Sequence, residues 1–293
     1  MNFDAILIIG HGSRDARGAA EIASIAPMAR RLVGNDVAVE VGFLELSDPP
    51  AMDRVDSLAR AGARRVAVVP LMLNSAGHSR SDVPAIVLAA RAAYPGITFA
   101  YAEPLGDDFA LLELGREALR ASGGTGKPLA TFFRGTSEPS ANAHAYEITR
   151  LLADLNGSRS CFVGFSGITW PSVQEALDHA RAAGVQELAT FSWFLATGVL
   201  VERIDSEVAA FAEQAGLSVF NAGYLGINPG IAELVVERAM AAMEGRVRTP
   251  CDLCSYRRPF PGTEAHLGSP IGVGHSHLAA EHRHRHEYDG DPG

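Results

Sequence analysis

Short apolar runs alternate with longer segments of helical periodicity through most of the chain, as in an α/β protein. The runs are rich in Val, Ile, Leu and Ala and are continuous rather than alternating, which is typical of parallel strands buried on both faces. In the first half, the expected strands span residues 5–10, 37–44, 65–73 and 98–102. The expected helices there span residues 16–32, 50–61, 83–93 and 109–121. This order predicts a parallel sheet with right-handed crossovers.

The second half repeats the same order of elements. Its expected strands span residues 129–133, 160–165, 187–195 and 217–221. Its expected helices span residues 140–154, 171–183, 200–215 and 229–244. The sequence therefore predicts an α/β fold of two tandem Rossmann-like or flavodoxin-like domains, with parallel sheets related by pseudo-twofold symmetry. We place the domains at residues 1–122 and 123–245, with a flexible Gly- and Ser-rich junction near residues 122–128.

The two halves also share sequence, but only the first keeps the residues that can do chemistry. Residues 7–15 reappear as 130–138, and residues 43–49 reappear as 165–171. Glycines, Phe and Pro at scaffold positions survive in both copies. His11, in contrast, corresponds to Arg134, Glu45 to Gly167, and His78 to Val199 or Leu200. A duplicated scaffold with one chemically equipped half predicts one site per chain.

Composition narrows the class of protein. A chain of 293 residues with 47% hydrophobic residues has room for two domains. Its net charge of −9 argues against nucleic acid as a partner. No apolar run approaches the roughly 20 residues of a membrane span, and the N-terminus lacks the pattern of a signal peptide. Three cysteines cannot form a disulfide framework, so we expect a cytoplasmic protein.

Three candidate metal ligands follow successive strands of the first repeat. His11 comes after the first strand, Glu45 after the second and His78 after the third. Because the carboxyl ends of parallel strands meet at one edge of the sheet, these side chains are expected to lie close together. Two imidazoles and a carboxylate suit a borderline divalent ion such as Co²⁺, Fe²⁺, Ni²⁺ or Zn²⁺, and leave coordination positions open.

Each of these residues also has an ordinary explanation. His11 could form local hydrogen bonds in a turn, Glu45 could be a solvated carboxylate at a strand end, and His78 could belong to a surface loop. Their joint placement, and their joint loss in the second copy, favour a shared site. The segment 10–13 precedes a helix, but it lacks the glycine patterns of nucleotide-binding loops, so no nucleotide is expected.

The segments around these residues resemble a known family. Gly10-His11-Gly12-Ser13-Arg14, then Phe43-Leu44-Glu45, and then Pro70-Leu71-Met72-Leu73 with Gly77-His78, are similar to the CbiX-type sirohydrochlorin cobaltochelatases and their ferrochelatase relatives. These class II chelatases insert a divalent metal into a tetrapyrrole without ATP. The resemblance covers residues 4–244 in the order of the long, internally duplicated form.

The resemblance implies roles for individual residues. His11 and His78 match the metal-binding and catalytic histidines, and Glu45 matches their acidic partner. The metal would be a substrate, with Co²⁺ favoured and Fe²⁺ or Ni²⁺ as alternatives. The other substrate would be an anionic tetrapyrrole in the cleft between the domains.

The remaining candidates in the two domains are substrate-binding residues. They are Ser13, Arg14, Ser79, Arg80 and Arg134. The arginines would pair with carboxylates of the ring, and Arg134 would face the metal residues across the pseudo-twofold axis. A solvated surface charge is the alternative for each arginine. At the level of function, the alternatives are a non-enzymatic carrier of metal or tetrapyrrole and a ferrochelatase that acts on another porphyrin.

Residues 246–293 lose periodicity and are expected to form a flexible tail rich in Cys and His. An auxiliary metal site is predicted there, at Cys251, Cys254, His275, His277, His282, His284 and His286. An unstructured solubilising tail is the alternative. An iron–sulfur cluster is not favoured, because one CxxC supplies two thiolates and a cluster takes about four. The duplication supplies both domains within one chain, so we expect a monomer, with a homodimer as the alternative.

Overall fold

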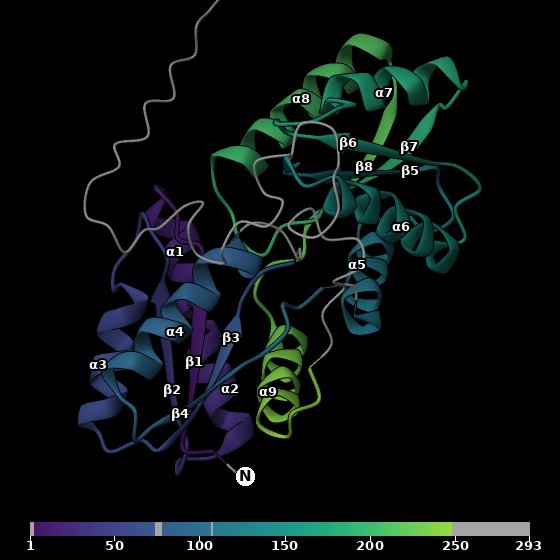
Figure 1. Cartoon of the computed structure of the whole chain (residues 1–293). Helices are drawn as coiled ribbons and strands as arrows, with labels where there is room; N and C mark the ends of the chain where they lie inside the picture. The colour runs from purple at the N-terminus through teal and green to yellow at the C-terminus, as the bar shows by residue number, and fades with distance from the viewer. Residues whose placement is uncertain (1–2, 74–77, 107, 248–293) are drawn as a thin grey trace, which may run out of the picture.

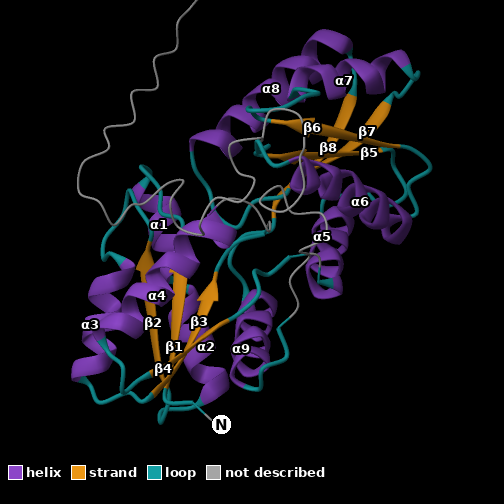
Figure 2. Cartoon of the chain, viewed as in Figure 1, coloured by secondary structure: helices purple, strands orange, loops and turns teal. Residues whose placement is uncertain are grey.

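The computed structural model describes residues 3–73, 78–106 and 108–247, which form two lobes, each built on a parallel four-stranded sheet (Figures 1 and 2). The first sheet has the order β2-β1-β3-β4. Its strands are β1 (Ala5–Gly10), β2 (Ala38–Phe43), β3 (Arg65–Pro70) and β4 (Thr98–Tyr101). The helices of this part of the chain are α1 (Ala16–Ala23), α2 (Ile25–Val33), α3 (Ala51–Arg60), the π-helix η1 (His78–Asp82), α4 (Val83–Ala93) and α5 (Phe109–Ala121).

The second sheet repeats this order as β6-β5-β7-β8. Its strands are β5 (Leu129–Phe133), β6 (Cys161–Phe165), β7 (Glu187–Ser192) and β8 (Ser218–Tyr224). The helices are α6 (Pro139–Asn156), α7 (Val173–Ala182), α8 (Val199–Ala215) and α9 (Pro229–Met243). The predicted α/β fold with two tandem parallel sheets is confirmed, and within the described residues no helix is both long and apolar enough to span a membrane.

The central strand of each sheet is fully buried, as its continuous apolar sequence predicts. Every residue of β1 from Ala5 to Ile9 has no exposed surface, and alternate side chains enter the cores on opposite faces of the sheet. β1 pairs with β2 and β3 in parallel register, which brings Gly10 beside Phe43 and Ile9 beside Pro70. The loops that leave these three strands therefore begin at one edge of the sheet.

The last helix of each repeat packs on the lobe of the other repeat. Helix α5 belongs to the first repeat in sequence but contacts α6, β7 and β8, whereas α9 returns to contact α2 and β3 (Figure 1). Gly115 allows the close approach of α5, since a Cβ there would lie 3.2 Å from the ring of Phe191. One apolar core cluster therefore runs through both lobes, and each lobe also has a core cluster of its own. The division at residue 122 stays a prediction about units of sequence, because the repeats exchange these helices.

The predicted helix over residues 16–32 is two helices in the structure. Helix α1 ends at Ala23, and α2 begins at Ile25. Pro27 has no N–H to donate to the carbonyl of Ala23, and the hydroxyl of Ser24 donates to the carbonyl of Glu21 at 2.6 Å. Both features interrupt the helical hydrogen-bond ladder at the same place, which apolar periodicity alone did not reveal.

Candidate metal centre

His11 stands in the tight turn that follows β1. Gly12 adopts a φ of +96°, and a Cβ at this position would lie 1.7 Å from the carbonyl oxygen of Glu45. The backbone N–H of Glu45 donates to the carbonyl of His11 at 3.1 Å. Glycine is therefore required beside His11, because only glycine permits this close approach of the loops after β1 and β2.

A pair of serines closes the same two loops. The N–H of Ser13 donates to Oγ of Ser47 at 2.9 Å, and the Ser47 hydroxyl donates back to the carbonyl of Ser13 at 3.0 Å. Oγ of Ser13 also accepts from the N–H of Asp15 at 3.0 Å. The structure thus places Ser13, predicted to bind substrate, in contacts that fix the loop carrying His11.

The three predicted metal ligands converge at this edge of the first sheet. Nε2 of His11 lies 3.1 Å from Nε2 of His78 and 3.2 Å from Oε1 of Glu45. The two imidazole rings meet edge to face, with centroids 4.5 Å apart and an interplanar angle of 86°. Two ligands that each lie about 2.1 Å from a shared ion are separated by about 3 to 3.5 Å. The spacing therefore fits a common metal ion.

Hydrogen bonds on the far side of each ring aim the two Nε2 lone pairs at one another. Nδ1 of His11 lies 3.2 Å from the carbonyl of Gly12, and Nδ1 of His78 lies 2.5 Å from Oδ2 of Asp82. Both oxygens can only accept, so each Nδ1 carries the proton and each Nε2 is left as an acceptor. Two such nitrogens and the carboxylate of Glu45 repel one another unless a cation lies between them.

Asp82 is a functional residue that the sequence reasoning missed. It lies at the end of η1, four residues after His78, and only 4% of its surface is exposed. A buried carboxylate on the distal nitrogen of a metal-binding histidine fixes the ring and strengthens its basicity. The spacing of four residues would have pointed to Asp82 had a helix been predicted there, but helical periodicity begins only at Val83.

Asp82→Asn is expected to weaken Co²⁺ binding by about 10- to 100-fold, because the amide can donate a hydrogen to Nδ1 and so select the wrong tautomer of His78. Isothermal titration of the full chain with Co²⁺ measures this effect. Asp178→Asn, at a half-exposed position on α7, is the matched control and should bind as wild type does. Equal affinities for the two variants would remove Asp82 from the site.

The environment of His11 keeps its imidazole neutral. Burial lowers its pKa to about 4, and the neighbouring His78 and Arg134 act in the same direction, against the opposing effects of Glu45 and the Gly12 carbonyl. A histidine with this pKa offers its lone pair to a metal at neutral pH. Protons compete with the metal for this nitrogen only when the pH approaches the pKa of about 4. The effect of Arg134 shows that this second-repeat residue lies close enough to act on the site.

The lowered pKa of His11 also predicts an acid-dependent loss of stability. Near pH 7 this histidine is neutral in both states, but between pH 6.5 and pH 4 the unfolded chain binds a proton that the folded chain does not. The free energy of unfolding should therefore fall by about 2 kcal/mol from pH 7 to pH 5 on account of this residue. Urea unfolding at the two pH values should show a smaller fall in His11→Gln. An identical fall in wild type and variant would refute the assigned pKa.

The predicted arginines occupy different environments. Arg14 and Arg134 are exposed, at the carboxyl ends of the first and second sheets. Arg80 is largely buried and pairs across the lobes with Glu138 at 3.8 Å. Ser79 is buried as well, and its carbonyl accepts a hydrogen bond from the hydroxyl of Tyr101. Arg14 and Arg134 are thus placed to meet a ligand from solvent, whereas Ser79 and Arg80 hold η1 in position.

Helix α1 of the first lobe contacts the second lobe near the carboxyl end of its sheet. The carboxylate of Glu21 in α1 accepts from the N–H of Thr197 at 2.8 Å and from the hydroxyl of Tyr224 at 3.2 Å. Nearby, Arg17 pairs with Glu202 of α8 at 2.5 Å. Within the described residues, His11, Glu45 and His78 form the single cluster with metal-ligand spacing. The candidate site is therefore asymmetric, with the possible metal ligands on one lobe and Arg134 on the other.

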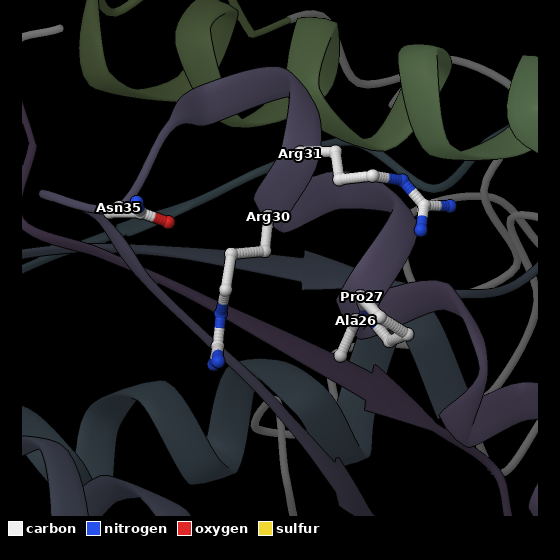
Figure 3. A pocket seen from close by; sticks show the side chains of 5 residues that line it. All are labelled: Ala26, Pro27, Arg30, Arg31 and Asn35. Carbon is white, nitrogen blue, oxygen red and sulfur yellow. The ribbon is translucent and has the colours of Figure 1, made fainter.

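A surface hollow on α2 lies apart from this chemistry. It has a volume of about 320 Å³ and is lined by Ala26, Pro27, Arg30, Arg31 and Asn35 (Figure 3). The side chains of Arg30 and Arg31 extend in different directions, and Arg30 donates to the carbonyl of Val39 at 3.0 Å. The two guanidinium groups do not converge on a ligand, so the hollow offers no second site.

The predicted auxiliary site lies outside the described residues. Its members are Cys251, Cys254, His275, His277, His282, His284 and His286. Cys161, which the sequence analysis left out of this set, begins β6 and is partly buried, and burial raises the pKa of its thiol.

The sequence and the fold both have characterised relatives. A sequence model of the CbiX family matches residues 5–122 and, a second time, residues 128–242. The chain is 33% identical over 260 residues to a sirohydrochlorin cobaltochelatase of Priestia megaterium, which covers 86% of this chain and 84% of that protein. It is 26% identical over 247 residues to a sirohydrochlorin ferrochelatase of the same organism, with coverages of 83% and 92%.

Solved structures also share this fold. SirB from Bacillus subtilis with Fe³⁺ superposes with a TM-score of 0.74 at 24% identity, over 83% of this chain and 97% of SirB. The sirohydrochlorin chelatase SirB from Bacillus subtilis subspecies spizizenii, in complex with cobalt, gives a TM-score of 0.70 at 24% identity, over 82% and 95% of the two chains. Both lobes are therefore part of the common architecture.

Proposed function

Because this chain belongs to the CbiX family, we propose that it is a chelatase that inserts a divalent metal ion, one of its two substrates, into sirohydrochlorin. The observation that carries the proposal is the convergence of His11, Glu45 and His78, three acceptors spaced for one ion at one end of the first sheet. Three protein ligands leave coordination positions that the ring nitrogens can take.

Insertion is an exchange of ligands with a release of protons. As ring nitrogens bind the ion, the two imidazoles and the carboxylate dissociate from it. The two ring N–H protons then pass to these side chains. The low pKa of His11, about 4, means that a proton taken up there moves on readily to solvent. The ion leaves with the ring, and the acceptor cluster is restored for the next turnover.

Arg14 and Arg134 are proposed to hold the acidic edge of the ring. Both guanidinium groups are exposed, and Arg134 is near enough to His11 to lower its pKa. A guanidinium can pair with a carboxylate through two parallel hydrogen bonds, which fixes orientation as well as binding. These arginines would hold the ring over the ion from both lobes, Arg14 from the first repeat and Arg134 from the second.

Cobalt is the metal that we favour as substrate. The support is the greater identity to the cobaltochelatase relative, 33% against 26% for the ferrochelatase of the same organism. The ligand set itself binds most first-row divalent ions in their usual order of affinity, so it does not choose between cobalt and iron.

An anaerobic assay with a large excess of sirohydrochlorin and Co²⁺, Fe²⁺ or Ni²⁺ over protein tests the function, with the visible spectrum of the ring as readout. Many turnovers per chain, fastest with Co²⁺, are expected. A single equivalent of product per chain would indicate a carrier rather than an enzyme. Turnover with protoporphyrin but not with sirohydrochlorin would make the protein a ferrochelatase for another ring.

A further inference from the structure

The loop after the second strand of each lobe projects an aliphatic side chain into solvent through a left-handed residue. Leu46, after β2, has a φ of 61° and is 50% exposed, and Ile168, after β6, has a φ of 71° and is 65% exposed. They occupy equivalent positions of the two repeats, and they are the two non-glycine residues with positive φ in the described part of the chain. Such a backbone is uncommon for leucine and a marked outlier for the β-branched isoleucine.

The surrounding loop is built the same way in both lobes. The N–H of Phe43 donates to the carbonyl of Pro49 at 3.0 Å, and the N–H of Phe165 donates to the carbonyl of Pro171 at 2.8 Å. These bonds close the two loops just behind Leu46 and Ile168. The unfavourable conformation is thus specified twice by the fold, at positions where at least half of the residue surface stays exposed.

Each aliphatic residue lies in a loop linked to a candidate site residue of its own lobe, Glu45 in the first lobe and Arg134 in the second. Leu46 directly follows the metal-ligand candidate Glu45. Ile168 follows Gly167, whose carbonyl lies so close to Gly135 that a Cβ there would be 2.2 Å away. Gly135 in turn follows Arg134, which acts on His11. Both residues therefore belong to loops that carry, or closely approach, the residues that would hold the metal and the carboxylates.

The second lobe carries a larger apolar surface at this loop. Trp170, two residues after Ile168, is 79% exposed, and Asp48 takes the equivalent position in the first lobe. The indole and the isoleucine on this loop leave most of their surface exposed, and such apolar patches commonly mark a ligand site. The polar substitution in the first lobe matches the asymmetry of the metal site.

We propose that Leu46 from the first lobe, and Ile168 with Trp170 from the second, contact the apolar faces of the tetrapyrrole and hold it over the metal site. The inference rests on the proposed function. An ion bound by Glu45 can reach the ring nitrogens only if the ring lies against the loop that continues into Leu46. A flat ring with carboxylates at its edge needs apolar contacts for its faces and cations for its edge, and the two loops with Arg14 and Arg134 supply both.

Glycine substitutions separate this role from a structural one. Leu46→Gly and Ile168→Gly remove the side chain and at the same time give the left-handed position the residue that adopts it most readily. Each variant should unfold at the same temperature as wild type or above it. Each should bind metal-free sirohydrochlorin about tenfold or more weakly, because an apolar contact is lost. Trp170→Ala should weaken ring binding to a similar extent.

The experiment is an anaerobic titration of the full-length variants with metal-free sirohydrochlorin, paired with a separate titration with Co²⁺ and a thermal scan. Leu151→Ala, at an exposed position on α6, is the matched control and should leave all three readouts unchanged. Weaker ring binding with unchanged Co²⁺ affinity supports the proposal. Wild-type ring affinity in Ile168→Gly and Trp170→Ala overturns it, whatever the thermal scan shows. If wild-type protein itself neither binds nor metallates sirohydrochlorin, the proposed function fails instead.

Discussion

Replacing His11 and His78 together by alanine is expected to reduce the rate of cobalt insertion by at least about 100-fold while the protein stays folded. Loss of a buried partner of a metal ligand alone weakens metal binding by about 10- to 100-fold, so loss of two ligands should exceed that. Both side chains are partly exposed, and neither belongs to an apolar core. Their removal therefore leaves no large cavity.

His179→Ala is the control variant for this experiment. This histidine lies exposed in the last turn of α7, far along the chain from the site. It should retain wild-type turnover, measured by the visible spectrum of the ring with Co²⁺ in excess. Circular dichroism and the unfolding midpoint confirm that each variant is folded. Full turnover in the double variant would contradict the assignment of His11 and His78 to the metal centre.

Gly12→Ala is expected to damage both the fold and the site. At a φ of +96° an alanine is strained, and its Cβ would meet the carbonyl oxygen of Glu45 at 1.7 Å. The loops after β1 and β2 must then separate, which moves His11 away from Glu45. We expect a loss of about 3 kcal/mol in the free energy of unfolding, together with the loss of Co²⁺ binding.

Alanine variants of two other glycines separate the effects of backbone strain and of the steric clash from the effect on Co²⁺ binding. Gly34 has a φ of +86° with open space around it, so Gly34→Ala should cost only about 1 kcal/mol and leave Co²⁺ binding intact. Gly135 occupies the position of Gly12 in the second repeat, and its Cβ would lie 2.2 Å from the carbonyl of Gly167. Gly135→Ala should therefore destabilise the protein but retain Co²⁺ binding. Urea unfolding and cobalt titration measure both effects, and loss of Co²⁺ binding in Gly135→Ala would contradict a site confined to the first repeat.

The sequence was sufficient to predict the sheet and the three converging residues. Continuous apolar runs marked the buried strands, and parallel strands bring their carboxyl ends to one edge, so His11, Glu45 and His78 had to lie near one another. His11 and His78 follow β1 and β3, the neighbouring strands between which the strand order reverses. Ligands of open α/β sheets bind at the carboxyl ends of such a pair of strands.

Other features carry no local signal. The exchange of α5 and α9 between lobes depends on the match of apolar surfaces far apart in sequence, such as Gly115 against Phe191. Helical periodicity does not extend into the π-helix η1, so the contact of Asp82 with His78 was not predicted. Positive φ at Leu46 and Ile168 could not be foreseen, because neither residue favours it. These are positions where tertiary structure overrides local preference.

The two repeats are proposed to divide the work: the metal ligands lie on the first repeat alone, and Arg134 of the second repeat helps to hold the ring. His11 and Arg134 occupy equivalent positions of the two sheets, but His11 is proposed to bind the metal and Arg134 to bind ring carboxylates. A ligand to the ion should govern the rate at saturating ring, whereas a partner of ring carboxylates should govern the concentration of ring that is required.

The most direct test is the steady-state rate of cobalt insertion, measured against sirohydrochlorin concentration at saturating Co²⁺, in His11→Ala and Arg134→Ala. We expect kcat to be lowered by about 100-fold or more in His11→Ala. In Arg134→Ala we expect the KM for sirohydrochlorin to rise about tenfold or more, with kcat nearly unchanged. Loss of kcat in both variants to the same extent, or a wild-type kcat in His11→Ala, would contradict this division of roles.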